Sequence, residues 1–221
     1  LCPDFCGRQM NGRRYIRIHK AMKYLCLDFE TNGFPKKGAV PSEYTLPFSS
    51  YPIQLSIHSV DGTTGEVEHV YTTLIKGATR FNPWVVENVP VTLEDIATGK
   101  NFPEVLEDMA ALIEPGDVLV AHNIQFDLGT AVSRTAQRLG IDSAALRTIM
   151  EAPRFCTYRC AYVKAVFGKG PNMKKLCEHF QVTLDNAHDA RVDSKALAEC
   201  VSQAIFRGVM MNPTHDIMSS E

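Results

Sequence analysis

Residues 24–33 read Tyr24-Leu25-Cys26-Leu27-Asp28-Phe29-Glu30-Thr31-Asn32-Gly33, and the rest of the chain can be placed around them. The apolar first half predicts a buried strand. Successive strand side chains point to opposite faces, so Asp28 and Glu30 share one face while Phe29 points into the core. Two carboxylates this close repel each other unless a cation lies between them, and oxygen ligands suit Mg²⁺ or Mn²⁺. Because a solvated strand end fits the same pair, the metal interpretation depends on partners elsewhere in the chain.

The composition indicates one globular α/β domain. The chain has 221 residues, enough for a substantial core without disulfides. Lys and Arg number 23 against 25 Asp and Glu, so the net charge does not attract polyanions and a nucleic acid would have to be held locally. Several of the seven cysteines lie in apolar runs, and no signal peptide or membrane-spanning stretch is visible. We therefore expect a reduced intracellular protein, cytoplasmic or nuclear, that does not contact a membrane.

Hydrophobic periodicity predicts further strands and helices after the first strand. The expected strands after 24–30 are 53–58, 67–74, 117–121 and 155–158. The expected helices are two short ones within 82–98 and longer ones over 102–113, 128–139, 159–167, 173–180 and 188–206. The turn at Asp61-Gly62 places the second and third strands in an antiparallel meander beside the first. This order predicts an α/β fold with a mixed central sheet flanked by helices on both faces.

The ends of the chain and one long loop lie outside this pattern. We expect the domain to span residues 22–207, followed by a frayed tail over 208–221. Residues 1–21 are rich in Lys and Arg, and they are either a basic arm that gathers nucleic acid or a flexible lead-in. Residues 33–50 are rich in Gly, Pro and Ser, and they predict a long loop at the carboxylate end of the first strand. That loop either borders the site or is an ordinary surface loop.

Two further motifs occur at the starts of expected helices. His122-Asn123 to Phe126-Asp127 follows the strand at 117–121, and His188-Asp189-Ala190 to Asp193 opens the last expected helix. Four acids and one histidine then occur in the order typical of the DEDDh family of 3′-to-5′ exonucleases: Asp28, Glu30, Asp127, His188 and Asp193. From about residue 22 to 206 the sequence resembles that family. Taken singly, each acid also fits an ordinary helix start or solvated position, and the histidine a cap or surface residue.

The resemblance implies a ribonuclease H-like fold and phosphodiester hydrolysis with two Mg²⁺ or Mn²⁺ ions. By analogy with the family, Asp28 bridges both ions. Glu30 and Asp193 serve the ion that prepares the attacking water, and Asp127 acts through bound water on the other ion. His188 is the expected general base, because an imidazole takes up a proton near neutral pH when it lies within hydrogen-bond reach of the water.

The same resemblance implies contacts to the substrate. Thr31 and the backbone of Asn32 and Gly33 are expected to meet the 3′-terminal nucleotide, with Asn123 and Phe126 lining the same pocket. A position in the core is the alternative for Phe126. The expected reaction releases nucleoside 5′-monophosphates from the 3′ ends of single-stranded DNA or RNA.

Two other functions are consistent with the sequence. One is a module that holds nucleic-acid ends with weak or no catalysis, and the other is a metal phosphohydrolase that acts on small substrates. The choice between DNA and RNA is open, because the 2′-hydroxyl is sensed by the shape of the pocket. Because many members of the family pair as dimers, a homodimer is one expectation, and protein partners are open.

Overall fold

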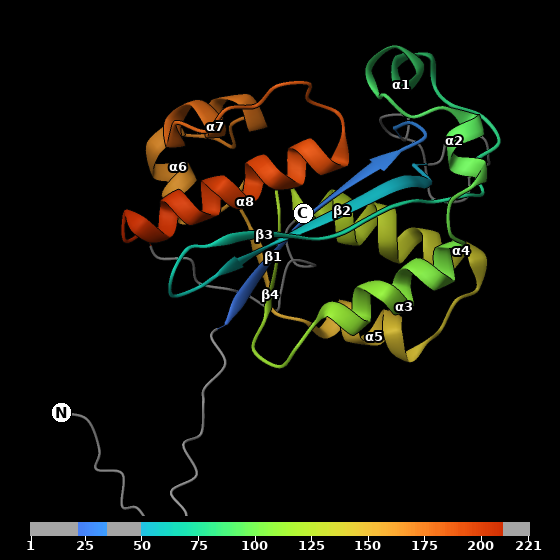
Figure 1. Cartoon of the computed structure of the whole chain (residues 1–221), viewed down its shortest axis with the longest axis horizontal. Helices are drawn as coiled ribbons and strands as arrows, with labels where there is room; N and C mark the ends of the chain where they lie inside the picture. Colours follow the sequence, from blue (N-terminus) through green and yellow to red (C-terminus); the bar gives the residue numbers. More distant parts are fainter. Residues whose placement is uncertain (1–21, 35–49, 210–221) are drawn as a thin grey trace, which may run out of the picture.

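A five-stranded sheet in the order β3-β2-β1-β4-β5 lies at the centre of the described chain (Figure 1). The computed structural model describes residues 22–34 and 50–209. The predicted arm at 1–21, most of the loop at 33–50 and nearly all of the tail lie outside the described residues. The strands are β1 Lys23–Thr31, β2 Pro52–Asp61, β3 Val67–Leu74, β4 Val118–Ala121 and β5 Arg154–Cys156.

The sheet is mixed, as predicted. β1 pairs antiparallel with β2 and parallel with β4, and β2 pairs antiparallel with β3. The predicted meander of the first three strands is therefore confirmed. Beyond β4, the edge strand β5 is parallel to its neighbour and begins one residue earlier than predicted.

Helices cover both faces of the sheet (Figure 1). They are α1 Pro83–Asn88, α2 Leu93–Ala97, α3 Phe102–Leu112, the π-helix η2 Gln125–Arg134, α4 Thr135–Leu139, α5 Ala144–Glu151, α6 Ala161–Phe167, α7 Met173–Phe180 and α8 Ala190–Phe206. One face is covered by α3, α5 and η2, and the other by α8, with α6 and α7 packed beside it. None of the described helices has the length and apolar character that crossing a membrane requires.

The alternation along β1 sorts its side chains between the two faces. Leu25, Leu27 and Phe29 join the core beneath α3 and α5, whereas Tyr24 and Cys26 join the core beneath α8. The next two residues on the α8 face are Asp28 and Glu30, at the end of β1 that points toward α1 (Figure 1). The register thus places both acids near the first turn of α8.

Of the predicted helix boundaries that were wrong, two concern the site, whereas α6, away from it, begins at Ala161 rather than at residue 159. The last helix begins at Ala190 rather than His188, because the Asp189 side chain accepts a hydrogen bond from Arg191 N and caps the helix. His188 therefore lies before the helix, in the left-handed region with φ 74°. The helix expected at 128–139 begins at Gln125 and is a π-helix in its first part, so Asp127 lies in its first turn. A short helix, α5, was not predicted, although Ser143 accepts a capping hydrogen bond from Leu146 N.

Candidate active site

Four carboxylates from three elements meet at the end of β1. Asp28 and Glu30 come from β1, Asp127 from η2 and Asp193 from α8. Burial raises the pKa of Asp28 well above its usual range, and the nearby charges of the other three acids and of Asp189 raise it further. The structure therefore brings all four predicted acids together, with Asp28 at the centre of the cluster.

A backbone hydrogen bond attaches Asp127 to β1. Its Oδ1 accepts from the N–H of Phe29, at 3.1 Å, between the two β1 acids. Asp127 is buried, and burial raises its pKa to about 7, while the Phe29 hydrogen bond opposes the rise. The first turn of η2 is thus held against the strand that carries Asp28 and Glu30.

Asp193 joins the cluster with one oxygen unpaired. Its Oδ2 accepts from the backbone N–H of His188 at 2.9 Å, which shapes the turn ahead of α8. Its Oδ1 is buried and has no hydrogen-bond partner among the described residues. Burial raises the pKa of Asp193, and the hydrogen bond from the His188 backbone opposes this rise. A buried carboxylate oxygen without a donor is costly unless a cation meets it.

Glu30, His188 and Asp193 form the tightest part of the site. Each offers one ligand atom, and these three atoms lie within 4.8 Å of one another. Burial and the nearby charges of Asp193, Asp127 and Asp189 together raise the pKa of Glu30 to about 8. The carboxylate oxygens, the orphaned Asp193 Oδ1 and the mutual repulsion all fit a hard divalent cation.

An aromatic wall beside the carboxylates was not predicted. The ring of Trp84, on α1, meets that of His188 edge to face, with centroids 4.9 Å apart. Phe34 lies 5.5 Å from Trp84 and 6.1 Å from Phe126 by ring centroids, and it is 53% exposed. Phe126 is half-buried and borders the site rather than the core. The sequence signal for Trp84 was weak: Asn82-Pro83 predicted the helix start, but no pattern linked that helix to the site.

The predicted substrate contacts are mostly engaged within the protein. Thr31 Oγ1 donates to the carbonyl of Gly33 at 3.0 Å. Asn32 is buried, its backbone N–H donates to Tyr51 O, and its Oδ1 accepts from Tyr51 N. Asn123 has a left-handed backbone, φ 83°, and its carbonyl accepts from Phe126 N at 2.7 Å. Asn32 therefore shapes the loop, and its backbone N–H is already used.

Other polar residues near the site are structural. Asp189 Oδ1 accepts from Gln54 Nε2 at 3.1 Å, and Gln54 Oε1 accepts from Ala190 N at 3.1 Å, so a β2 side chain holds the start of α8. His122 Nε2 lies 3.0 Å from the carbonyl of Pro171, which can only accept, so this nitrogen carries the proton. His122 thus fastens the second motif to the loop before α7.

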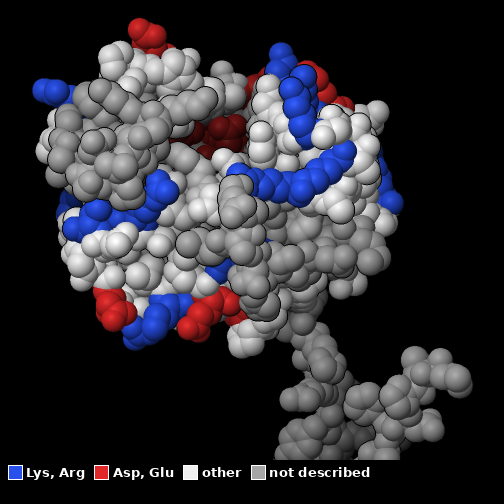
Figure 2. Space-filling model, turned by 180° about the vertical axis from the view of Figure 1, so that it is seen from behind, with Lys and Arg blue, Asp and Glu red and all other residues white. Residues whose placement is uncertain are grey.

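The surface carries a recessed acidic area. Figure 2 shows a face on which acidic side chains lie at the bottom of a hollow, with Lys or Arg side chains at its borders. Such an arrangement suits a polyanion whose phosphate reaches a cation held by the acids.

Comparison with known families shows which family the chain belongs to. The sequence model of the exonuclease family RNase_T matches residues 25–201, from β1 into α8. The chain belongs to the exonuclease family. This membership confirms the resemblance drawn from the sequence motifs, and a nuclease activity follows from it. Among curated proteins, no sequence matches the chain.

Solved exonuclease structures share the fold. A 3′-exonuclease that recognises the 3′ end of a histone mRNA stem-loop is 16% identical, with TM-score 0.67, over 87% of this chain and 85% of that one. The nuclease domain of 3′hExo, a DEDDh family member bound to rAMP, is 17% identical, with TM-score 0.66, over 89% of this chain and 98% of that one. E. coli exonuclease I in complex with a dT13 oligonucleotide is 19% identical, with TM-score 0.61, over 83% of this chain but 41% of that one. These likenesses confirm the predicted ribonuclease H-like fold.

Proposed function

We propose that this exonuclease is of the DEDDh type and removes nucleotides from the 3′ ends of single-stranded DNA or RNA with two Mg²⁺ or Mn²⁺ ions. The observation that carries the proposal is the convergence of four acids with His188 at the end of β1, where Asp193 Oδ1 has no donor among the described residues. Solved structures of the same fold, one with rAMP and one with dT13, support a single-stranded nucleic acid as substrate.

Each acid would have a distinct place around the ions. Asp28, at the centre of the cluster, would contact both. Glu30 and Asp193 lie beside His188, so they would hold the ion nearer the attacking water, and Asp127 the other. When bound, the ions supply the activation of water and the stabilisation of charge on the leaving oxygen.

His188 would accept the proton of the attacking water. It is exposed on the turn before α8, within 4.8 Å of Glu30 and Asp193 by ligand atoms, and its ring is held by Trp84. The water oxygen forms a bond to phosphorus as the bond between phosphorus and the 3′ oxygen of the preceding nucleotide breaks. The products are a nucleoside 5′-monophosphate and a strand one nucleotide shorter with a free 3′-hydroxyl.

The rings beside His188 would receive the terminal base. Phe34 and Trp84 are partly exposed and Phe126 is half-buried, so aromatic surface faces the solvent next to the acids. Base–aromatic stacking tolerates every base, which suits a nuclease without sequence preference. Thr31, Gly33 and Asn123 remain predicted contacts, and a homodimer and an intracellular location remain predictions.

One gel assay tests the proposal. A 5′-labelled linear strand with Mn²⁺ should give a ladder that shortens from the 3′ end, and a 3′-labelled strand should release a labelled mononucleotide at once. EDTA should stop both reactions, and a circular strand should persist. Binding without cleavage would indicate an end-binding module, and cutting the circle as fast as the linear strand would contradict exonuclease action.

A further inference from the structure

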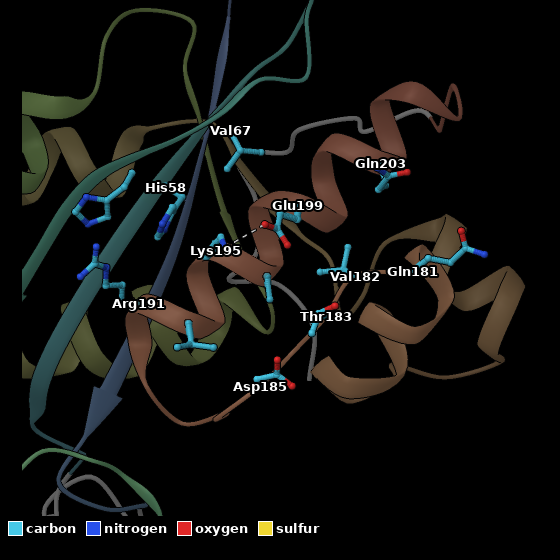
Figure 3. Close-up of a pocket in the computed structure, with 13 residues that line it drawn as sticks. His58, Val67, Gln181, Val182, Thr183, Asp185, Arg191, Lys195, Glu199 and Gln203 are labelled. Atoms are coloured by element: carbon cyan, nitrogen blue, oxygen red, sulfur yellow. Dashed lines mark ion pairs between the residues drawn. The ribbon is translucent and has the colours of Figure 1, made fainter.

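A groove of about 890 Å³ crosses the exposed side of α8, outside the carboxylate cluster. Side chains of β2 and β3 line it on one side of α8, and residues 181–183 and 185 line it on the other (Figure 3). Its volume falls within the range of sites for small molecules, about 300 to 1,000 Å³. None of the four clustered acids lines it, so the groove is a separate feature.

Positive charge gathers on the β3 side of the groove. Arg191 and Lys195 are four positions apart on α8, so their side chains share one face and repel each other. His69 of β3 lies with its ring 5.0 Å from that of buried His58, and His58 Nδ1 lies 2.9 Å from Ser194 Oγ on α8. Burial, together with neighbouring His69, Arg191 and Lys195, lowers the pKa of His58 to about 4.

These cations are weakly neutralised within the protein. Lys195 Nζ lies 3.5 Å from Glu199, in an exposed pair of little strength. No carboxylate in the described parts of the chain forms an ion pair with the Arg191 guanidinium. Figure 3 shows Arg191 on the same side of α8 as His58, with Asp185 on the other side. A bound anion would relieve the repulsion between the two α8 cations.

The rest of the lining selects the kind of anion. Apolar side chains of Val67, Val182 and Val192 lie along the groove with the polar side chains of Gln181 and Thr183. Apolar surface with nearby hydrogen-bonding groups suits a nucleobase. Asp185 lies across α8 from Arg191, and Glu199 pairs with Lys195, so both acids would repel further phosphates and the charge pattern fits a single phosphate.

We propose that this groove binds one nucleotide unit, with its phosphate at Arg191, Lys195 and His69 and its base along the valines. This proposal rests on the proposed function, because that reaction provides a nucleotide unit from two sources. One source is the nucleoside 5′-monophosphate product, and the other is an upstream nucleotide of the substrate strand.

Calorimetric titration of the full chain with adenosine 5′-monophosphate in EDTA tests the site, because EDTA removes the divalent ions through which the carboxylates would hold a phosphate. The nucleotide should bind more tightly than adenosine or inorganic phosphate. Arg191→Gln should weaken its binding about tenfold, because a charge-assisted contact to phosphate is lost. The matched control is Arg147→Gln, which removes the same charge from an exposed pair with Asp142 on α5 and should leave the affinity unchanged. Equal affinities for Arg191→Gln and wild type, or no preference for the nucleotide over adenosine, would overturn the site.

A short oligonucleotide added in the same buffer separates the two sources. If the oligonucleotide displaces the monophosphate and this displacement depends on Arg191, the occupant of the groove is the substrate strand. If both bind at the same time, the occupant is the free product. Cleavage with Mn²⁺ then separates this site from the proposed function. If binding depends on Arg191 but the strand is not cleaved, the nucleotide site stands and the proposed function is overturned. If the strand is cleaved but binding does not depend on Arg191, the proposed function stands and the nucleotide site is overturned.

Discussion

The first turns of α8 border two regions of like charge, the carboxylate cluster on one side and the groove with Arg191 and Lys195 on the other. These two regions differ in burial. In the carboxylate cluster Asp127 is 3% exposed and Asp193 8%, so water screens their repulsion poorly and their pKa values rise. In the groove the Lys195 side chain is 62% exposed, and water screens its repulsion from Arg191. Buried like charges require resident counterions, whereas exposed ones need only an exchangeable anion. The cluster is therefore suited to holding ions throughout catalysis, and the groove to a ligand that comes and goes.

The largest expected effect comes from Asp28→Asn, because it removes the central charge of the cluster. Cleavage should fall by about 10⁴-fold, since the bound ions supply several kcal/mol of transition-state stabilisation. In EDTA the same variant should unfold at a higher temperature than wild type, because one buried repulsive charge is gone. Strand cleavage and thermal unfolding measure both changes. Asp142→Asn, on an exposed pair, is the control, and a lower unfolding temperature for Asp28→Asn in EDTA would argue against buried repulsion.

His188→Ala should affect the rate while leaving the ions in place. Turnover should fall by about 10² to 10⁴-fold, because a general base is lost. Binding of Mn²⁺ should largely survive, because the four acids are intact and Asp193 accepts from the backbone, not the side chain, of residue 188. Single-turnover cleavage and Mn²⁺ titration separate the two effects. Cleavage at the wild-type rate would remove His188 from the mechanism.

The stability of the metal-free protein should fall as pH rises from about 4 to about 8. The pKa of Asp127 is raised from 3.8 to about 7 and that of Glu30 from 4.5 to about 8, so their stabilising contribution is complete below pH 4 and is lost as these groups ionise in the fold. The loss should be a few kcal/mol between pH 6 and 9.

Added Mn²⁺ should oppose this loss, because it binds the ionised carboxylates. Thermal unfolding in EDTA and in Mn²⁺ at pH 6 and pH 9 should therefore show a gap that widens with pH. A gap that narrows would contradict ion binding by groups with raised pKa values.

The smallest expected effect in the active site comes from Trp84→Ala. Loss of the edge-to-face contact should lower kcat about tenfold, because an aromatic pair contributes about 0.5 to 1.5 kcal/mol to holding the His188 ring. Trp84→Phe should recover most of the rate. Val86→Ala, at a 65% exposed position on the same helix, is the control. If Trp84→Ala raised only KM, the ring would serve the substrate rather than His188.

The sequence by itself determined the sheet and the pairing of acids on β1. The period of two along residues 24–30 separates Phe29 from Asp28 and Glu30, and the Asp61-Gly62 turn places β2 and β3 beside β1. These features are local, so a pattern of a few residues predicts them. The sequence also predicted the order of the later acids, with His188 five residues before Asp193.

Only the tertiary structure decided how these groups meet. Trp84 lies 104 positions from His188, and no periodicity relates α1 to the turn before α8. The orphaned Asp193 Oδ1 and the raised pKa of Asp28 result from burial by three elements together. Likewise, the groove forms where β3 brings His69 to the side of α8 that carries Arg191 and Lys195. Desolvation and contacts between distant elements depend on how the chain packs, so local sequence patterns do not contain them.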